Sequence, residues 1–249
     1  FVEKDFKSLT SKSEDGKYRA KRFKELLKAL ENSLSSSFAD SGHVIGRWNY
    51  PKSSKAYEHS WLAKYFGKKE KDTVQFKVSL NKIDPVHTGL YIGKQAKVTH
   101  KNIAELIKER KHDCFKILSN LPSTYSIFVR NKKDGMEEEF VVPNLKMETM
   151  DFIVKAISMK ETNLFVGRFF DKPEAIGMGT GIIKEFSDTF EELLPLHRFL
   201  TGQNGEQIIN DLDRKLEEWL KRGARKYDKS IEDYARDLGK DEWESRYET

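Results

Sequence analysis

Aromatic and cationic side chains alternate within residues 44–66, and these residue types can contact a nucleobase together with its phosphate. Trp48 and Tyr50 are followed closely by Lys52 and Lys55. A ring face can stack on any base, at about 1–3 kcal/mol per stack, while a lysine ammonium attracts the phosphate backbone. We therefore predict that Trp48 and Tyr50 present exposed rings and that the two lysines contact phosphates.

Three further rings in the same stretch have a spacing that favours packing instead. Tyr57, Trp61 and Tyr65 stand four residues apart. Side chains at this spacing share one face of a helix, and such a face usually packs into a core. We therefore predict a helix here, with Trp61 and Tyr65 in the core.

Other cations stand in a predicted hairpin and in a predicted helix. Arg130, Lys132 and Lys133 precede or adjoin an Asp-Gly pair, a common turn signal, between two β-rich runs. These three are predicted to contact phosphates. Residues 17–34 form a helix by period, with Lys and Arg crowding the side away from its apolar stripe. That basic side is either a solvated surface or a second phosphate-contacting one.

Residues 72–77 suggest a different chemistry. Asp72, Gln75 and Lys77 follow the order of a nuclease strand, in which acids hold a metal ion and lysine supports the attacking water. No second acid upstream can be identified, and strand alternation alone places Gln75 and Lys77 on one face. A metal-dependent nuclease is therefore an alternative.

Other recognised catalytic and metal-binding patterns are missing. The six histidines do not have the spacing of metal ligands, and the single Cys114 lies on the apolar side of a predicted helix, where we expect it to be buried. Gly177–Gly181 precede a helix but lack the Lys-Ser/Thr of a phosphate loop, so we interpret them as a flexible helix entry. We expect no metal, no cofactor and no catalytic residue.

The composition indicates a basic body and an acidic tail. Residues 203–249 carry 10 Lys or Arg and 13 Asp or Glu, whereas residues 1–202 carry 35 and 27. A basic body is compatible with a nucleic-acid partner.

No run approaches the ~18 apolar residues of a membrane span, so no membrane partner is expected. The low cysteine count fits a cytoplasmic location. The first residue is Phe, which is consistent with a fragment of a longer chain.

The clearest fold signal runs from Val74 to Asn144. It predicts strand, turn, strand, helix, strand, turn and strand, from period-2 runs on each side of a helix at 99–121. Residues 147–159 and 163–170 are predicted to form another hairpin. A loop at 171–180 then leads into a helix at 182–194.

These elements predict an α+β fold with a mainly antiparallel sheet, barrel-like in one alternative, flanked by helices on the outside. We expect a frayed segment at 1–16, an α+β domain at 17–202, and a helical C-terminal tail or linker at 203–249. Within the tail, the apolar spacing predicts helices at 206–227 and 231–238.

The order of four features resembles the N-terminal DNA-specificity domain of McrB-type modification-dependent restriction proteins. The features are the opening helix at 17–34, a turn at Gly46-Arg-Trp48, apolar strands around Gly89-Leu-Tyr-Ile92, and a closing helix at Ile182–Leu200. The resemblance implies a basic α/β domain that binds DNA carrying a modified base, often by flipping it into an aromatic pocket. The AAA+ motor of that family does not follow here, which leaves a fragment or a different family.

The leading hypothesis is a non-catalytic module that recognises nucleic acid, DNA first and a modified base in particular, within a defence or restriction system. Cations would neutralise phosphates, and Trp48 and Tyr50 would stack on an extruded base. The alternatives are the metal-dependent nuclease and a scaffold that binds a protein partner or a further domain through its C-terminal helices.

Overall fold

A computed structural model of the chain describes residues 1, 5, 14–49, 57–66, 73–81, 86–131, 133, 135–159 and 161–202. The chain divides into two units, Phe1–Gly202 and Gln203–Thr249, and only the first contains described residues. The predicted tail helices therefore lie outside the described residues, as does most of the segment predicted to fray.

Seven antiparallel strands form one sheet in the order β1-β2-β3-β4-β7-β5-β6. The strands are β1 Gly42–Asn49, β2 Tyr57–Tyr65, β3 Gln75–Asn81, β4 Val86–Ile92, β5 Ser126–Asn131, β6 Met136–Val141 and β7 Thr162–Phe170. The predicted α+β class with an antiparallel sheet is confirmed. The barrel alternative is wrong, because β1 and β6 end the sheet as two separate edges and do not pair with each other.

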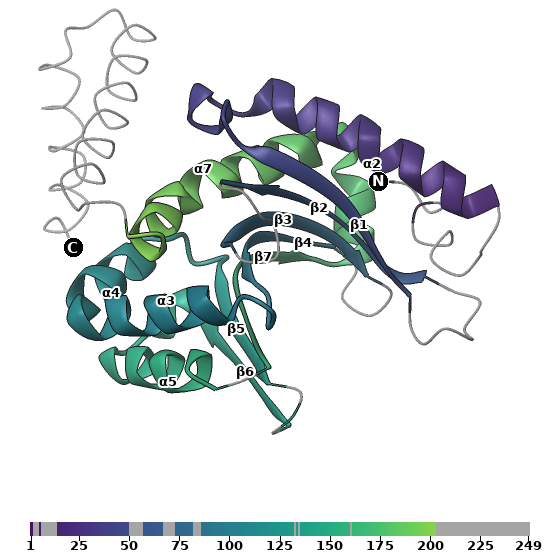
Figure 1. The fold of residues 1–249 in the computed structure, drawn as a ribbon. Helices are drawn as coiled ribbons and strands as arrows, with labels where there is room; N and C mark the ends of the chain where they lie inside the picture. The colour runs from purple at the N-terminus through teal and green to yellow at the C-terminus, as the bar shows by residue number, and fades with distance from the viewer. Residues whose placement is uncertain are drawn as a thin grey trace, which may run out of the picture. The chain divides into compact units, whose positions relative to one another are not determined.

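Strand β7, the last strand along the described residues, enters the middle of the sheet between β4 and β5 (Figure 1). The helical connection from β4 to β5 leaves this place open, and β7 fills it from a distant part of the sequence. Because both of its neighbours are antiparallel to it, β7 joins the β1–β4 meander to the β5–β6 hairpin.

The helices form two groups around this sheet (Figure 1). They are α2 Glu14–Ser33, α3 Lys97–Glu109, α4 Lys111–Ser119, α5 Met147–Ile157, α6 Lys172–Gly177 and α7 Ile182–Leu200, with single 3₁₀ turns at Ser36–Phe38, Val142–Asn144 and Gly179–Gly181. Helices α2 and α7 pack on each other, and α7 also contacts β4 and β7. The second group consists of α3, α4 and α5.

The main core lies between α7 and the strands. Phe76 of β3 packs against Phe190 of α7, with 5.2 Å between ring centroids, and against Phe38, at 4.9 Å. All three side chains are buried. Helix α7 supplies an apolar stripe of 3.6-residue period to this core, and it continues through Pro195 to Leu200, beyond the predicted end at 194.

The order of elements predicted for Val74–Asn144 is confirmed, except that two helices replace the single helix predicted at 99–121. Strands β3 and β4, two successive helices, α3 and α4, and strands β5 and β6 follow in the expected order. The opening helix is also confirmed, although α2 begins at Glu14, inside the segment that was expected to fray.

Four local predictions are wrong. Tyr57, Trp61 and Tyr65 lie on strand β2, because a spacing of four places side chains on one face of a strand as well as of a helix, and pairing with β1 and β3 decides between them. Residues 147–157 form helix α5 instead of a strand. The buried positions Met150, Ile153, Val154 and Ile157 follow a helical period.

The loop predicted at 171–180 is also largely helical. Asp171 caps α6, since its side chain accepts a hydrogen bond from the Glu174 amide at 2.7 Å. The glycines at 179 and 181 then form the 3₁₀ turn that enters α7. The predicted turn at Gly46-Arg-Trp48 lies within strand β1.

Candidate functional site

The two faces of the sheet differ in chemistry, as strand alternation requires. The face toward the helices carries the apolar residues Phe76, Val78, Leu80, Leu90, Leu164, Val166, Ile127 and Val129. The opposite face, called the aromatic face below, carries Trp61, Tyr65, Gln75, Lys77, Ser79, His87, Tyr91, Phe128, Phe165 and Phe169.

Lys77 lies at the centre of the aromatic face, and its ammonium group lies between two rings. Its Nζ atom is 4.1 Å from the ring centroid of Tyr91 and 5.0 Å from that of Trp61. Only 5% of the residue is exposed. A cation desolvated over two ring faces is attracted by both quadrupoles, which contributes to holding the rings and the amine in one arrangement.

The strand register explains why these three side chains meet. Lys77 pairs directly with Ala63 on β2 and with Gly89 on β4. Because these direct neighbours have small side chains or none, the larger rings of Trp61 and Tyr91, at diagonal positions, can reach the lysine.

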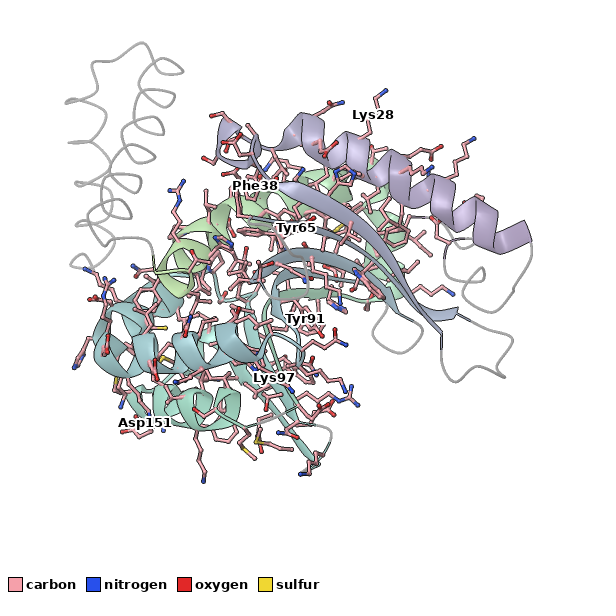
Figure 2. The ribbon with its side chains drawn as sticks, viewed as in Figure 1. Lys28, Phe38, Tyr65, Tyr91, Lys97 and Asp151 are labelled. Carbon is pink, nitrogen blue, oxygen red and sulfur yellow. The ribbon has the colours of Figure 1, made fainter. Side chains whose placement is uncertain are left out.

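Tyr91 is fixed by a hydrogen bond as well as by Lys77. Its hydroxyl donates to Oδ1 of Asn163 at 2.8 Å, and the backbone N–H of Lys94 donates to the same oxygen at 3.0 Å. Burial raises the pKa of Tyr91 to about 12, so the hydroxyl remains a hydrogen-bond donor at neutral pH. Figure 2 labels Tyr91 and the nearby helix residue Lys97.

A second group of rings extends the aromatic face toward β5. His87 lies 5.1 Å from Phe165 and 5.7 Å from Phe169, and Phe128 lies 6.4 Å from Phe169, centroid to centroid. Phe169 is 40% exposed, which is unusual for a large apolar side chain. The aromatic face therefore offers an accessible ring at Phe169, next to His87 and Phe165.

The predicted site residues fall into two groups. Tyr50, Lys52, Lys55 and Lys132 lie outside the described residues. Trp48 is in β1, where its backbone pairs with His59, and the description does not extend to its side chain. Their predicted roles stay predictions.

The two remaining predicted residues lie at the β5–β6 hairpin. Arg130 is exposed on β5 and its Nε is 3.1 Å from Oε2 of Glu137, its cross-strand neighbour. Lys133 is exposed in the turn, and its N–H donates to Oδ1 of Asn131 at 3.0 Å. The structure therefore places Lys133 at an accessible position and pairs Arg130 with a carboxylate.

Sequence reasoning missed Tyr91 as a partner of Lys77, and it assigned Trp61 to a helix. The available signal was alternation: Gln75, Lys77 and Ser79 occupy every second position of β3 and face away from its apolar residues. This alternation separates the polar face of β3 from its apolar face.

Of the residues of the nuclease alternative, Gln75 and Lys77 lie in the described part of the chain, and Asp72 lies outside it. Gln75 and Lys77 share one face, as alternation predicts, but the Lys77 ammonium lies on Trp61 and Tyr91. Within the described ranges, no group of three or more His, Cys, Asp or Glu side chains is arranged to hold a metal ion.

Cys114 is buried, as its place in the apolar stripe predicts. It is 1% exposed, and burial raises its thiol pKa to about 12. A thiol with that pKa is almost entirely protonated at neutral pH, so it packs as a small apolar group.

No helix in the described part of the chain is both long and apolar enough to cross a bilayer. The sequence matches no protein-family model, and a search of curated proteins found no match.

Proposed function

We propose that the protein is a non-catalytic, cytoplasmic module that recognises nucleic acid through the aromatic face and the cations around it. DNA is the preferred target, and a modified base is the feature to be read, in a system that restricts foreign DNA. The resemblance of the sequence to McrB-type specificity domains, in the order of its opening helix, apolar strands and closing helix, supports this choice of target.

One observation carries the proposal, namely the position of the Lys77 ammonium between Trp61 and Tyr91. Stacking on a base requires ring faces held in place, and reading a base edge requires a polar group at a fixed position beside them. A buried lysine that is only a donor can recognise carbonyl or ring-nitrogen acceptors on that edge. Rings and donor therefore occur together on one face.

The basic body supplies the complementary long-range attraction. Residues 1–202 carry 35 Lys or Arg against 27 Asp or Glu. On α2, the exposed Lys24 and Lys28 point to solvent, and Lys28 extends away from the sheet in Figure 2. Such cations contribute an affinity that falls with salt and depends little on sequence.

The test is a fluorescence-anisotropy titration with duplex DNA, single-stranded DNA and RNA, each plain and base-modified, at two salt concentrations. A preference for one modified duplex that survives the higher salt supports base reading. Equal, salt-sensitive binding to every nucleic acid would leave only a generic basic surface. The absence of salt-sensitive binding to any of them would contradict the proposal.

A pair of lysine variants tests whether the aromatic face is responsible for a preference for modified DNA. Lys77→Met removes the charge and the donor but keeps a long apolar chain that can still pack against the two rings. Lys64 is an equally buried lysine, 4% exposed, on the opposite face, where its Nζ lies 2.9 Å from Oε1 of Glu31. We expect Lys77→Met to reduce the preference for modified base and Lys64→Met to leave it unchanged.

A further inference from the structure

Three lysines from separate segments act on one carboxylate near the end of β4, one through an ion pair and two through their charge. Lys94 follows β4, Lys97 begins α3, and Lys133 lies in the β5–β6 turn, while Glu161 precedes β7. The Nζ atom of Lys94 donates a hydrogen bond to Oε2 of Glu161 at 2.6 Å, and the two groups form an ion pair. That bond and the Lys94 charge lower the pKa of Glu161 most, and the charges of Lys97 and Lys133 add to the effect. The four side chains therefore form one electrostatic cluster, called the lysine cluster below.

The lysine cluster has an excess of positive charge. One carboxylate faces three ammonium groups, and only Lys94 is close enough to form an ion pair with it. Within the described ranges, neither Lys97 nor Lys133 forms an ion pair, and both are exposed. Two cations are thus available to an anion from solution.

The backbone at the start of α3 adds to this positive potential. Ala96 is the N-cap residue and has no side chain that can accept a hydrogen bond, and the first turn contains no acidic residue. The positive end of the helix dipole therefore has no anionic group of its own beside it. The α3 dipole adds to the positive potential of the lysine cluster, but a helix N-terminus by itself would not define a binding site.

Glu161, whose carboxylate balances part of the positive charge of the lysine cluster, has an unusual backbone conformation. Its φ is 68°, the left-handed region, and it is the single non-glycine residue with positive φ in the described part of the chain. A non-glycine residue in that region costs about 1 kcal/mol, and Asn, Asp or Gly are the usual occupants. A strained position that carries a carboxylate points to a role for the charge.

The lysine cluster is connected to the aromatic face through Asn163. The Oδ1 atom of Asn163 accepts hydrogen bonds from the Tyr91 hydroxyl and from the Lys94 N–H. The ring that contacts Lys77 and the backbone that carries Lys94 therefore meet at one oxygen atom. A base that contacts Tyr91 would therefore lie near the segment that carries Lys94.

We infer that Lys94, Lys97 and Lys133 bind the phosphate backbone of the nucleic acid, and that Glu161 is an internal counter-ion which the phosphate displaces. This inference rests on the proposed function, because it assigns the phosphate subsite of the same interface. Glu161 holds Lys94 in place in the free protein and opposes binding of weak or single anions. A phosphate that contacts all three lysines replaces it.

Single substitutions, measured by anisotropy over a series of salt concentrations, test the assignment. Lys94→Ala, Lys97→Ala and Lys133→Ala should each weaken binding about two- to fivefold at low salt. Each should also reduce the slope of log affinity against log salt by about 0.9 for duplex DNA, or about 0.7 for a single strand. Lys116→Ala, an exposed lysine on α4, is the matched control and should change neither quantity.

Two substitutions of Glu161 separate its charge from its backbone. Glu161→Gln removes the charge and keeps the strained φ, so affinity should rise about two- to fivefold with no gain in thermal stability. Glu161→Gly removes both, so affinity should rise equally and the melting temperature should increase as well. Unchanged or weaker binding in both variants would overturn the counter-ion role.

The outcomes distinguish this inference from the proposed function. If the wild-type protein binds nucleic acid but the three lysine variants match Lys116→Ala, the phosphate subsite lies elsewhere and the proposed function stands. If the wild-type protein binds no nucleic acid at any salt concentration, both fail. Loss of slope in the three variants, with tighter binding in Glu161→Gln, supports the inference.

Discussion

Gly89 and Gly167 face each other across strands β4 and β7, and neither position has room for a side chain. A Cβ atom at Gly89 would lie 2.2 Å from the Val166 carbonyl oxygen, and one at Gly167 would lie 2.2 Å from that of Thr88. The obstacle at both positions is backbone, which cannot rotate away as a flexible side chain can. The pair therefore allows β7 to approach β4 closely, beside Lys77.

Alanine at either glycine should destabilise the fold. We expect Gly89→Ala or Gly167→Ala to lower the free energy of unfolding by about 2–4 kcal/mol, because the strands must separate to admit the methyl group. Gly177→Ala is the control: a Cβ there meets nothing within 4 Å, and the residue ends helix α6. Urea denaturation followed by circular dichroism measures the difference, and equal stability of the three variants would contradict the packing argument.

His197 should make the protein sensitive to acid. The ring is 3% exposed and stacks on Phe76 at 5.0 Å, and burial, with the nearby Arg198 charge, lowers its pKa to about 4 despite a hydrogen bond with the Val74 backbone. Unfolded histidine binds a proton near pH 6.5, whereas the folded ring stays neutral until about pH 4. Stability is therefore constant above pH 6.5 and falls by roughly 3 kcal/mol between pH 6.5 and 4.

His197→Gln tests this dependence, because glutamine keeps a donor for the Val74 backbone but does not titrate. We expect the variant to lose most of the decline in stability between pH 6.5 and 4, measured by urea denaturation at several pH values. The pKa of His100 is also lowered by burial, so a smaller decline should remain in both proteins. Identical pH profiles would show that His197 does not control acid stability.

Tyr125 should make the protein less stable as the pH rises into the alkaline range, whereas His197 makes it less stable as the pH falls. It is fully buried, and its hydroxyl donates a hydrogen bond to the Glu192 carboxylate of α7. Burial, followed by the Glu192 interactions, raises its pKa above the ordinary value of 10. A raised folded pKa means that stability is present below pH 10 and is lost as the pH rises above it.

The variant Tyr125→Phe removes this hydrogen bond and this titration together. At pH 7 the variant should be less stable than the wild-type protein by about 1–2 kcal/mol. This deficit should shrink as the pH exceeds 10, because ionisation of Tyr125 then stabilises the unfolded state of the wild-type protein, and the variant has no such group. Tyr91 titrates in both proteins and does not affect the comparison. A deficit that stays constant through pH 11 would contradict the assignment.

Substitutions of Asn163 should affect both the stability of the protein and its affinity for nucleic acid. Asn163→Ala leaves the Tyr91 hydroxyl and the Lys94 N–H without their shared acceptor, which should cost about 1–3 kcal/mol of stability. Asn163→Asp keeps the acceptor oxygens, so the stability should change less. Its added negative charge beside the lysine cluster should still weaken nucleic-acid binding. Thermal denaturation and anisotropy on the same two variants measure both effects.

Those parts of the fold that follow from local periodicity can be predicted from the sequence alone. Alternation in β3 and the helical stripes of α2 and α7 are set by which side of each element must meet the core, so they are visible in short windows. The burial of Cys114 follows from the same periodicity.

Tertiary pairing decided what local spacing leaves ambiguous. The four-residue spacing of Tyr57, Trp61 and Tyr65 suits a helix and a strand equally, and hydrogen bonding with β1 and β3 selected the strand. The insertion of β7 between β4 and β5 is likewise a long-range event without a local signature.

The candidate site depends on such long-range placement. Lys77 meets Trp61 and Tyr91 because the register of three strands sets their diagonal positions. Lys94, Lys133 and Glu161 belong to segments that are far apart in the chain, and the sheet order brings them together. Residue types can be read from the sequence, but the contacts that give them a chemical role form only when the strands pair.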